Sequence, residues 1–190
     1  MQKTTKDAAE QAVETLSLGE KNRAFVGYWL SLWQGDALPE RERFDLMQLK
    51  ALAPGMMMFD VLPQNRVAVA QAGIDVCRAV GEPLDGIDWV ARAVIRNRGV
   101  RMRNFSGVAE GSLLVCRRTF RLTTGRLCAN EELILPFATR PDGTTPVMAY
   151  TDWKIDISAI RSIAEISQAA PHHKVLPLRR RRAPCTALSA

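Results

Sequence analysis

Five extended segments, gathered in two groups with a helical stretch between them, constrain the fold of this chain more than any other feature. The run Met56–Leu62 is short, apolar and bounded by glycine and proline, which favours a buried strand over a helix. A second strand is predicted at 67–72, and three more at 112–120, 127–137 and 146–153. Because these strands do not alternate with helices, the pattern predicts an antiparallel sheet in an α+β domain.

The helices expected around this sheet are short. Residues Lys6–Ser17 have helix-forming composition, and Phe25, Trp29 and Trp33 then recur on one stripe of a second helix. Glycines bound a brief helix at Ile74–Val80.

Three further expectations concern the segments between and after the strands. Asp88 is expected to cap a helix that has Trp89 and Ala93 inward, with Val94 as a further candidate for that side. Residues 100–111 are expected to form a loop. The pair Asp142-Gly143 predicts the turn between the last two strands, and a last helix is predicted from Ser158.

Length and charge indicate one domain with appendages. The chain has 190 residues and a net charge of +6, and residues 171–190 carry five cations and no acid. The expected organisation is an N-terminal helical extension (1–21), a sheet domain (22–156), a C-terminal helix (157–170) and a disordered basic tail (171–190). The sequence shows no apolar run near the ~20 residues of a membrane span and no signal peptide, so a cytoplasmic location is expected.

The sequence indicates no catalytic or metal site. It lacks the phosphate-loop, dinucleotide, zinc-protease and serine-hydrolase motifs. The pairs Asp85/Asp88 and Glu131/Glu132 are better explained as turn, cap and strand residues than as acid–base couples. No zinc site is expected, because the cysteines are widely separated in the sequence and both histidines are in the tail. These residues are Cys77, Cys116, Cys128, Cys185, His172 and His173.

In its order of segments the chain resembles a PAS domain, and more narrowly a bacterial PAS-like family, common in alphaproteobacteria, that was first catalogued as a domain of unknown function. The resemblance covers residues 22–153 and rests on "YWLSLWQGDALPERERFD", "LAPGMMMFDV", "GIDVCRAVGEPLDGIDW" and "ELILPF" before "DGTTPVMAY". The matching positions are Trp29, Leu38, Pro39, Arg41, Gly73, Cys77, Gly81, Leu84, Gly86, Leu135, Pro136 and Gly143.

This resemblance implies a five-stranded antiparallel sheet with short helices over one face and a small cleft between them. The strand alternation and the family fold together predict a cleft lined by Phe59, Val69, Cys77, Trp89, Val115 and Leu133. A small molecule could bind there, but its identity is not indicated. Haem ligated by histidine is disfavoured because both histidines lie in the tail, and a photoactive flavin is disfavoured because only Cys77 and Arg78 match its motif.

The expected role is that of a non-enzymatic sensory or protein-interaction module in bacterial signal transduction, with an unknown signalling protein as partner. The helix bearing Phe25, Trp29 and Trp33 is the candidate interaction surface, since its stripe could pack on its own sheet or on a second copy in a homodimer. The alternative is a regulatory protein that binds nucleic acid weakly through Arg179–Arg182, whose phosphate contacts would be salt-dependent.

Overall fold

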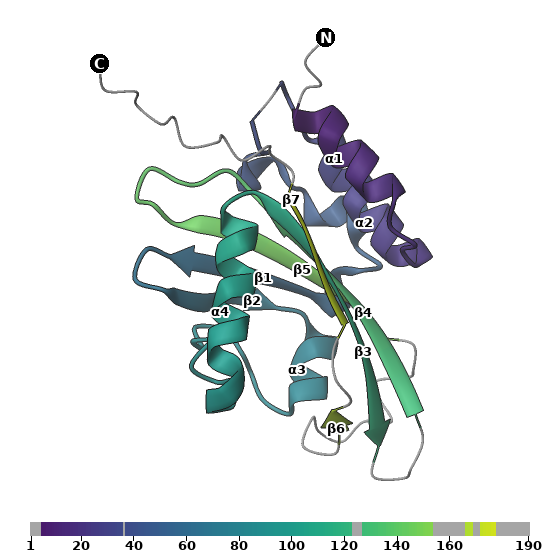
Figure 1. The fold of residues 1–190 in the computed structure, drawn as a ribbon, viewed down its shortest axis with the longest axis vertical. Helices are drawn as coiled ribbons and strands as arrows, with labels where there is room; N and C mark the ends of the chain where they lie inside the picture. Colours follow the sequence, from purple (N-terminus) through teal and green to yellow (C-terminus); the bar gives the residue numbers. More distant parts are fainter. Residues whose placement is uncertain (1–4, 36, 123–126, 154–165, 169–171, 178–190) are drawn as a thin grey trace, which may run out of the picture.

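A curved antiparallel sheet forms the centre of the computed structural model, which describes residues 5–35, 37–122, 127–153, 166–168 and 172–177. Its five long strands run in the order β2-β1-β5-β4-β3 (Figure 1). The predicted fold class, α+β with a PAS-like five-stranded antiparallel sheet flanked by helices, is confirmed. The strands are β1 (Met56–Leu62), β2 (Arg66–Ala72), β3 (Ser112–Leu122), β4 (Leu127–Pro136) and β5 (Thr145–Trp153).

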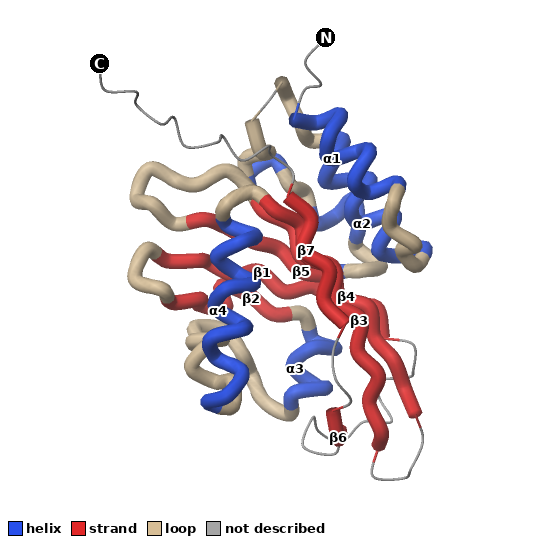
Figure 2. Tube along the Cα trace, viewed as in Figure 1, coloured by secondary structure: helices blue, strands red, loops and turns tan. Residues whose placement is uncertain are grey.

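Helices cover both faces of this sheet (Figure 2). On one face lie α1 (Thr5–Glu14) and α2 (Glu20–Ser31), and on the other lie α3 (Ile74–Val80) and α4 (Ile95–Ala109). Helix α4 contacts all five long strands. Between α2 and β1 the chain makes three single-turn 3-10 helices, η1 (Arg41–Arg43), η2 (Leu46–Leu49) and η3 (Ala53–Gly55).

Alternation of side chains along the strands divides the interior into two cores. In β1, Met57 and Phe59 face α3 and α4, whereas Met56 faces α2. The α2 core also holds Phe25 and Trp29, which are fully buried. Each helical layer is therefore held to the sheet by its own set of apolar residues.

Two expectations about the segment before β3 were wrong. Asp88 does accept hydrogen bonds from the backbone N–H groups of Val90 and Ala91, but it caps a turn and not a helix. The helix begins at Ile95 and runs through the residues expected to form a loop. Phe105 and Val108 are its buried residues, and the four arginines that precede them in the helix obscured its apolar side in the sequence.

The local turn chemistry was predicted well. Gly81 ends α3 with φ 88°, a left-handed conformation that glycine adopts without strain. In the β4–β5 connection, Asp142 accepts a hydrogen bond from the Thr144 N–H at 2.8 Å, and Gly143 has φ 82°. Both positions match the roles that the sequence assigned to them.

The C-terminal part of the chain differs from the expectation. Two short strands, β6 (Ile166–Gln168) and β7 (His172–Pro177), pair with the outer edge of β3. The predicted disordered tail is therefore wrong for 172–177, because the unpaired backbone groups of β3 are satisfied by this segment. The predicted C-terminal helix (157–170) is wrong at 166–168, which form β6. The rest of that helix and the end of the tail, including Arg179–Arg182, lie outside the described residues.

Candidate functional site

The structure brings together four of the six residues predicted to line a cleft. Phe59, Val69, Cys77 and Trp89 lie on the side of the sheet covered by α3 and α4. Val115 and Leu133 lie on the other side, in the α2 core, so that part of the prediction is wrong. In β3 and β4, apolar residues occur at both odd- and even-numbered positions, so both faces of each strand are apolar. The sequence alone therefore did not indicate which of the two sets faces α4. The residues that face it are Leu114 and Ile134.

Aromatic packing fills the apolar part of the α3/α4 side. The Phe59 ring lies 4.9 Å from that of Phe105 and 5.8 Å from that of Trp89, measured between centroids. Leu84, on the segment between α3 and α4, is fully buried beside them. These side chains occupy the region in which the sequence predicted a cleft that could hold a small molecule.

A charged group lies next to this aromatic packing, and we call Arg101, Cys116, Arg118 and Glu132 the inner charge cluster. The Arg118 guanidinium donates to Glu132 Oε2 at 2.5 Å and also hydrogen-bonds the Cys116 side chain. Arg101 donates from Nη1 to the Trp89 carbonyl oxygen at 2.7 Å, and its guanidinium lies 4.8 Å from the Trp89 ring centroid. Cation–π contact and hydrogen bond together fix this arginine.

The electrostatics of the inner charge cluster do not favour nucleophilic chemistry. Burial raises the pKa of the Cys116 thiol to about 12, so it remains protonated at neutral pH. Burial lowers the pKa of Arg101, against the attraction of Glu132. Burial also opposes the charge of Arg118, but the attraction of Glu132 and its hydrogen bond outweigh it and raise the pKa of Arg118. Two guanidinium groups face one carboxylate, so the cluster has spare positive charge for a small anion.

A second buried carboxylate, Glu131, lies on the opposite face of the same strand. Its Oε1 accepts hydrogen bonds from the Gly19 N–H at 2.8 Å and from Asn22 Nδ2 at 3.0 Å, and its Oε2 accepts one from Arg117 Nε at 2.8 Å. Burial opposes the charge of Glu131, but these three donors outweigh it and hold the pKa below its usual range. We call Gly19, Asn22, Arg117 and Glu131 the outer network.

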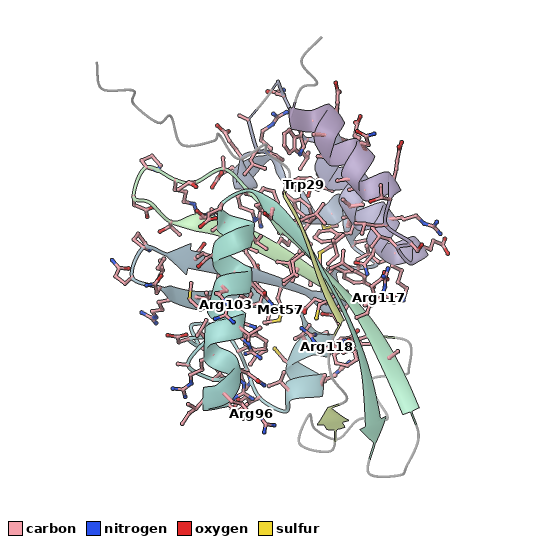
Figure 3. The ribbon with its side chains drawn as sticks, viewed as in Figure 1. Trp29, Met57, Arg96, Arg103, Arg117 and Arg118 are labelled. Carbon is pink, nitrogen blue, oxygen red and sulfur yellow. The ribbon has the colours of Figure 1, made fainter. Side chains whose placement is uncertain are left out.

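The inner charge cluster and the outer network are back to back. Arg117 is the cross-strand partner of Glu131, and Cys116 is that of Glu132. The adjacent residues of each strand point to opposite faces, as the labels of Arg117 and Arg118 show in Figure 3. The sequence indicated that only one of the two glutamates would face inward. Both are buried, because each face of the sheet has its own helical layer.

The predicted interaction surface is not exposed. Phe25, Trp29 and Trp33 are all buried against the chain's own sheet. The Trp29 indole donates from Nε1 to the Pro136 carbonyl oxygen at 2.9 Å, and its ring is edge-on to that of Trp33 at 5.3 Å. Of the two arrangements that the sequence allowed for this stripe, the structure has the one in which it packs on its own domain.

Sequence reasoning missed a small pocket at the start of β1. It is partly open and has a volume of about 40 Å³, enough for a few water molecules. Arg41 donates from Nε to the Met58 sulfur at 2.8 Å at this place. The sequence signal was the run of three methionines, which we used only to predict a strand. The lining residues are Arg41, Leu46, Ala53, Met56, Met57, Met58, Gln71, Gly73 and Met148.

Within the described ranges, no three of the side chains that bind metals through nitrogen, oxygen or thiolate lie close enough to hold an ion. In the same part of the chain, no helix has the length and apolar character needed to cross a membrane. Comparison with models of protein families found none that matches this chain, and comparison with curated proteins found no match.

Proposed function

We propose that this chain is a non-enzymatic sensory or protein-interaction module of the PAS type, acting in bacterial signal transduction. In this proposal the inner charge cluster responds to a small anion, such as a carboxylate or phosphate, and the α1–α2 layer transmits the response. The fold class supports the general role. The back-to-back placement of Glu132 and Glu131 supports the specific one.

This placement carries the proposal because Glu131 and Glu132 are adjacent residues of β4 whose side chains lie on opposite faces of the sheet. A movement of one of them is therefore passed to the other through the backbone. An anion that competes with Glu132 for Arg118 would leave the carboxylate without its partner, and an unpaired buried charge costs about 3–5 kcal/mol. A shift of β4 that relieves this cost would also move Glu131, which holds Gly19 and Asn22 at the start of α2. The α2 end is thus coupled to the cluster through one peptide unit.

Hydrogen exchange with mass spectrometry tests the coupling. The variant Glu132→Gln removes the charge of the inner carboxylate and keeps its shape, so amides of α2 should exchange faster, whereas those of β1 and β2 should be unchanged. Arg66→Gln is the matched control, because it breaks an exposed pair with Asp88 at the far edge of the sheet. Unchanged exchange in α2, or an equal increase in every element, would show that the two faces are not coupled.

Native mass spectrometry of freshly purified protein tests the ligand. A retained anion should add mass to the wild-type protein and not to Arg118→Gln, and the same spectrum reports whether the chain forms a homodimer. Because Phe25, Trp29 and Trp33 are buried, a homodimer would have to use another surface.

A further inference from the structure

The outer side of α4 carries an exposed surface that is both cationic and apolar. Val94 at its N-cap is 60% exposed, Ile95 is 82% exposed and Val100 is 43% exposed. Arg96, Val100 and Arg103 recur at i, i+4 and i+7, so they share one side of the helix, opposite the buried Phe105. Arg96 and Arg103 are labelled on this helix in Figure 3. We call Val94, Ile95, Arg96, Val100 and Arg103 the α4 patch.

The positive charge of this patch is not neutralised nearby. The segment from Trp89 to Ala109 has five arginines and no acidic residue. Three of the five are engaged elsewhere, because Arg92 pairs with Glu82, Arg98 donates to the Ala93 carbonyl oxygen and Arg101 is held by Trp89. Arg96 and Arg103 are the two arginines of the α4 patch. Within the described ranges, no carboxylate makes an ion pair with an arginine of the α4 patch.

The patch also departs from the rules that the other helices of this chain follow. Helices α1, α2 and α3 each have an acidic residue in the first turn, where the helix dipole favours negative charge. Helix α4 has none, carries Arg96 and Arg98 there instead, and has an N-cap valine whose side chain cannot accept a hydrogen bond. Exposed aliphatic side chains add to these unfavourable choices. Departures of this kind, gathered in one place, are typical of a functional surface.

We propose that the α4 patch binds the surface of a lipid bilayer with anionic headgroups. Its arginines would contact lipid phosphates, and Val94, Ile95 and Val100 would enter the boundary between headgroups and acyl chains. This association is peripheral and requires no membrane-spanning helix. It does not depend on the sensory role proposed above.

Two features favour a bilayer over other anionic partners. The patch has no aromatic side chain to stack on bases, and its aliphatic residues would have no use against a phosphate backbone. The patch is also convex, since it lies on the outer side of a helix that covers a sheet. A fluid interface adapts to a convex surface, whereas a folded protein partner must offer a matching groove.

Co-sedimentation of the full-length chain with vesicles tests this proposal. The protein should bind vesicles of phosphatidylcholine mixed with phosphatidylglycerol, should bind pure phosphatidylcholine far more weakly, and should be released by salt. Each arginine near an anionic surface contributes about fivefold in affinity, so Arg96→Gln with Arg103→Gln should lower the partition coefficient by about 25-fold. Ile95→Ser should lower it by about tenfold, since an exposed isoleucine would lose its burial in lipid.

Matched controls separate the patch from general charge and hydrophobicity. Arg23→Gln with Arg43→Gln removes the same net charge from exposed positions on α2 and η1, and Met47→Ser removes another exposed apolar side chain. Both controls should bind within about twofold of the wild-type protein. The proposal is wrong if the controls lose as much as the α4 variants, because binding then reflects net charge or the C-terminal arginines. It is equally wrong if the chain binds duplex DNA and ignores anionic vesicles.

Discussion

Replacement of Glu131 by alanine should destabilise the whole domain, because this carboxylate holds α2 to the sheet. The variant removes the acceptor of three donors: the Gly19 N–H, Asn22 Nδ2 and Arg117 Nε. Arg117 is 44% exposed at its side chain and can be solvated by water in the variant, so the loss of its ion pair with Glu131 should reduce stability only slightly. Asn22 is fully buried, and within the described residues its Oδ1 already lacks a partner. Its amide would keep only the Glu131 backbone carbonyl.

Hydrogen bonds to a charged group contribute about 1.5–3 kcal/mol each, and those around one carboxylate are not additive. We therefore expect Glu131→Ala to lower the free energy of unfolding by about 3 kcal/mol, out of the ~5–15 kcal/mol of a typical domain. Urea denaturation followed by circular dichroism measures this loss. Glu10→Ala is the control, because Glu10 forms only an exposed pair with Lys6 in α1, worth about 0.5 kcal/mol or less.

A double-mutant cycle identifies the cause of the loss. If Asn22 and Glu131 act together, Asn22→Ala with Glu131→Ala should cost less than the sum of the two single variants, by about 1 kcal/mol or more. Additive losses, or a loss below about 1 kcal/mol for Glu131→Ala, would refute the view that this network holds α2 in place.

Three further predictions concern pH, packing and thiol chemistry. Because the folded pKa of Glu131 lies below its ordinary value of 4.5, its stabilisation is present above that value and is lost as pH falls through the folded pKa; Glu131→Gln should flatten the acid side of a stability profile measured by urea melts. Gly73→Ala would place a Cβ 2.3 and 2.5 Å from two backbone oxygens and should cost about 2 kcal/mol or more, whereas Gly27→Ala, in open space on α2, should be neutral or stabilising by thermal melting. Cys116 should resist alkylation in the native protein at neutral pH, because burial raises its pKa to about 12, and peptide mapping should find the half-buried Cys77 alkylated before Cys116.

The strands were predictable where an apolar composition coincided with glycine or proline residues at both ends. Met56–Leu62 was predicted with the bounds that β1 has, because a short apolar run between a Pro-Gly pair and a proline leaves little choice. Helix α4 was misplaced because only Phe105 and Val108 among its residues are buried, and this signal is too sparse for a periodicity argument. Pairing of β7 with β3 joins segments about sixty residues apart, which local patterns do not reveal.

The candidate site was predictable only in part, for a reason that lies in the strands themselves. Where both faces of a strand are buried, as at Leu113 and Leu114, apolar residues occur at every position and alternation carries no information on direction. The prediction therefore chose Val115 and Leu133 in place of their neighbours. Glu131 and Glu132 were hard to predict for the same reason. Because both faces of β4 are buried, each carboxylate needs its own arginine partner on its own face, Arg117 for Glu131 and Arg118 for Glu132.

The segment between α3 and α4 determines how β2 can meet other molecules. Val69 uses its N–H for the Ile87 carbonyl oxygen and its carbonyl for the Gly86 N–H, and the Val67 carbonyl accepts from the Trp89 N–H. A strand donated by another chain would find these groups occupied. The β2 edge of the sheet is thereby protected from edge-to-edge aggregation. A peptide or a domain-swapped copy could extend the sheet there only after displacing Trp89 from its place beside Phe59.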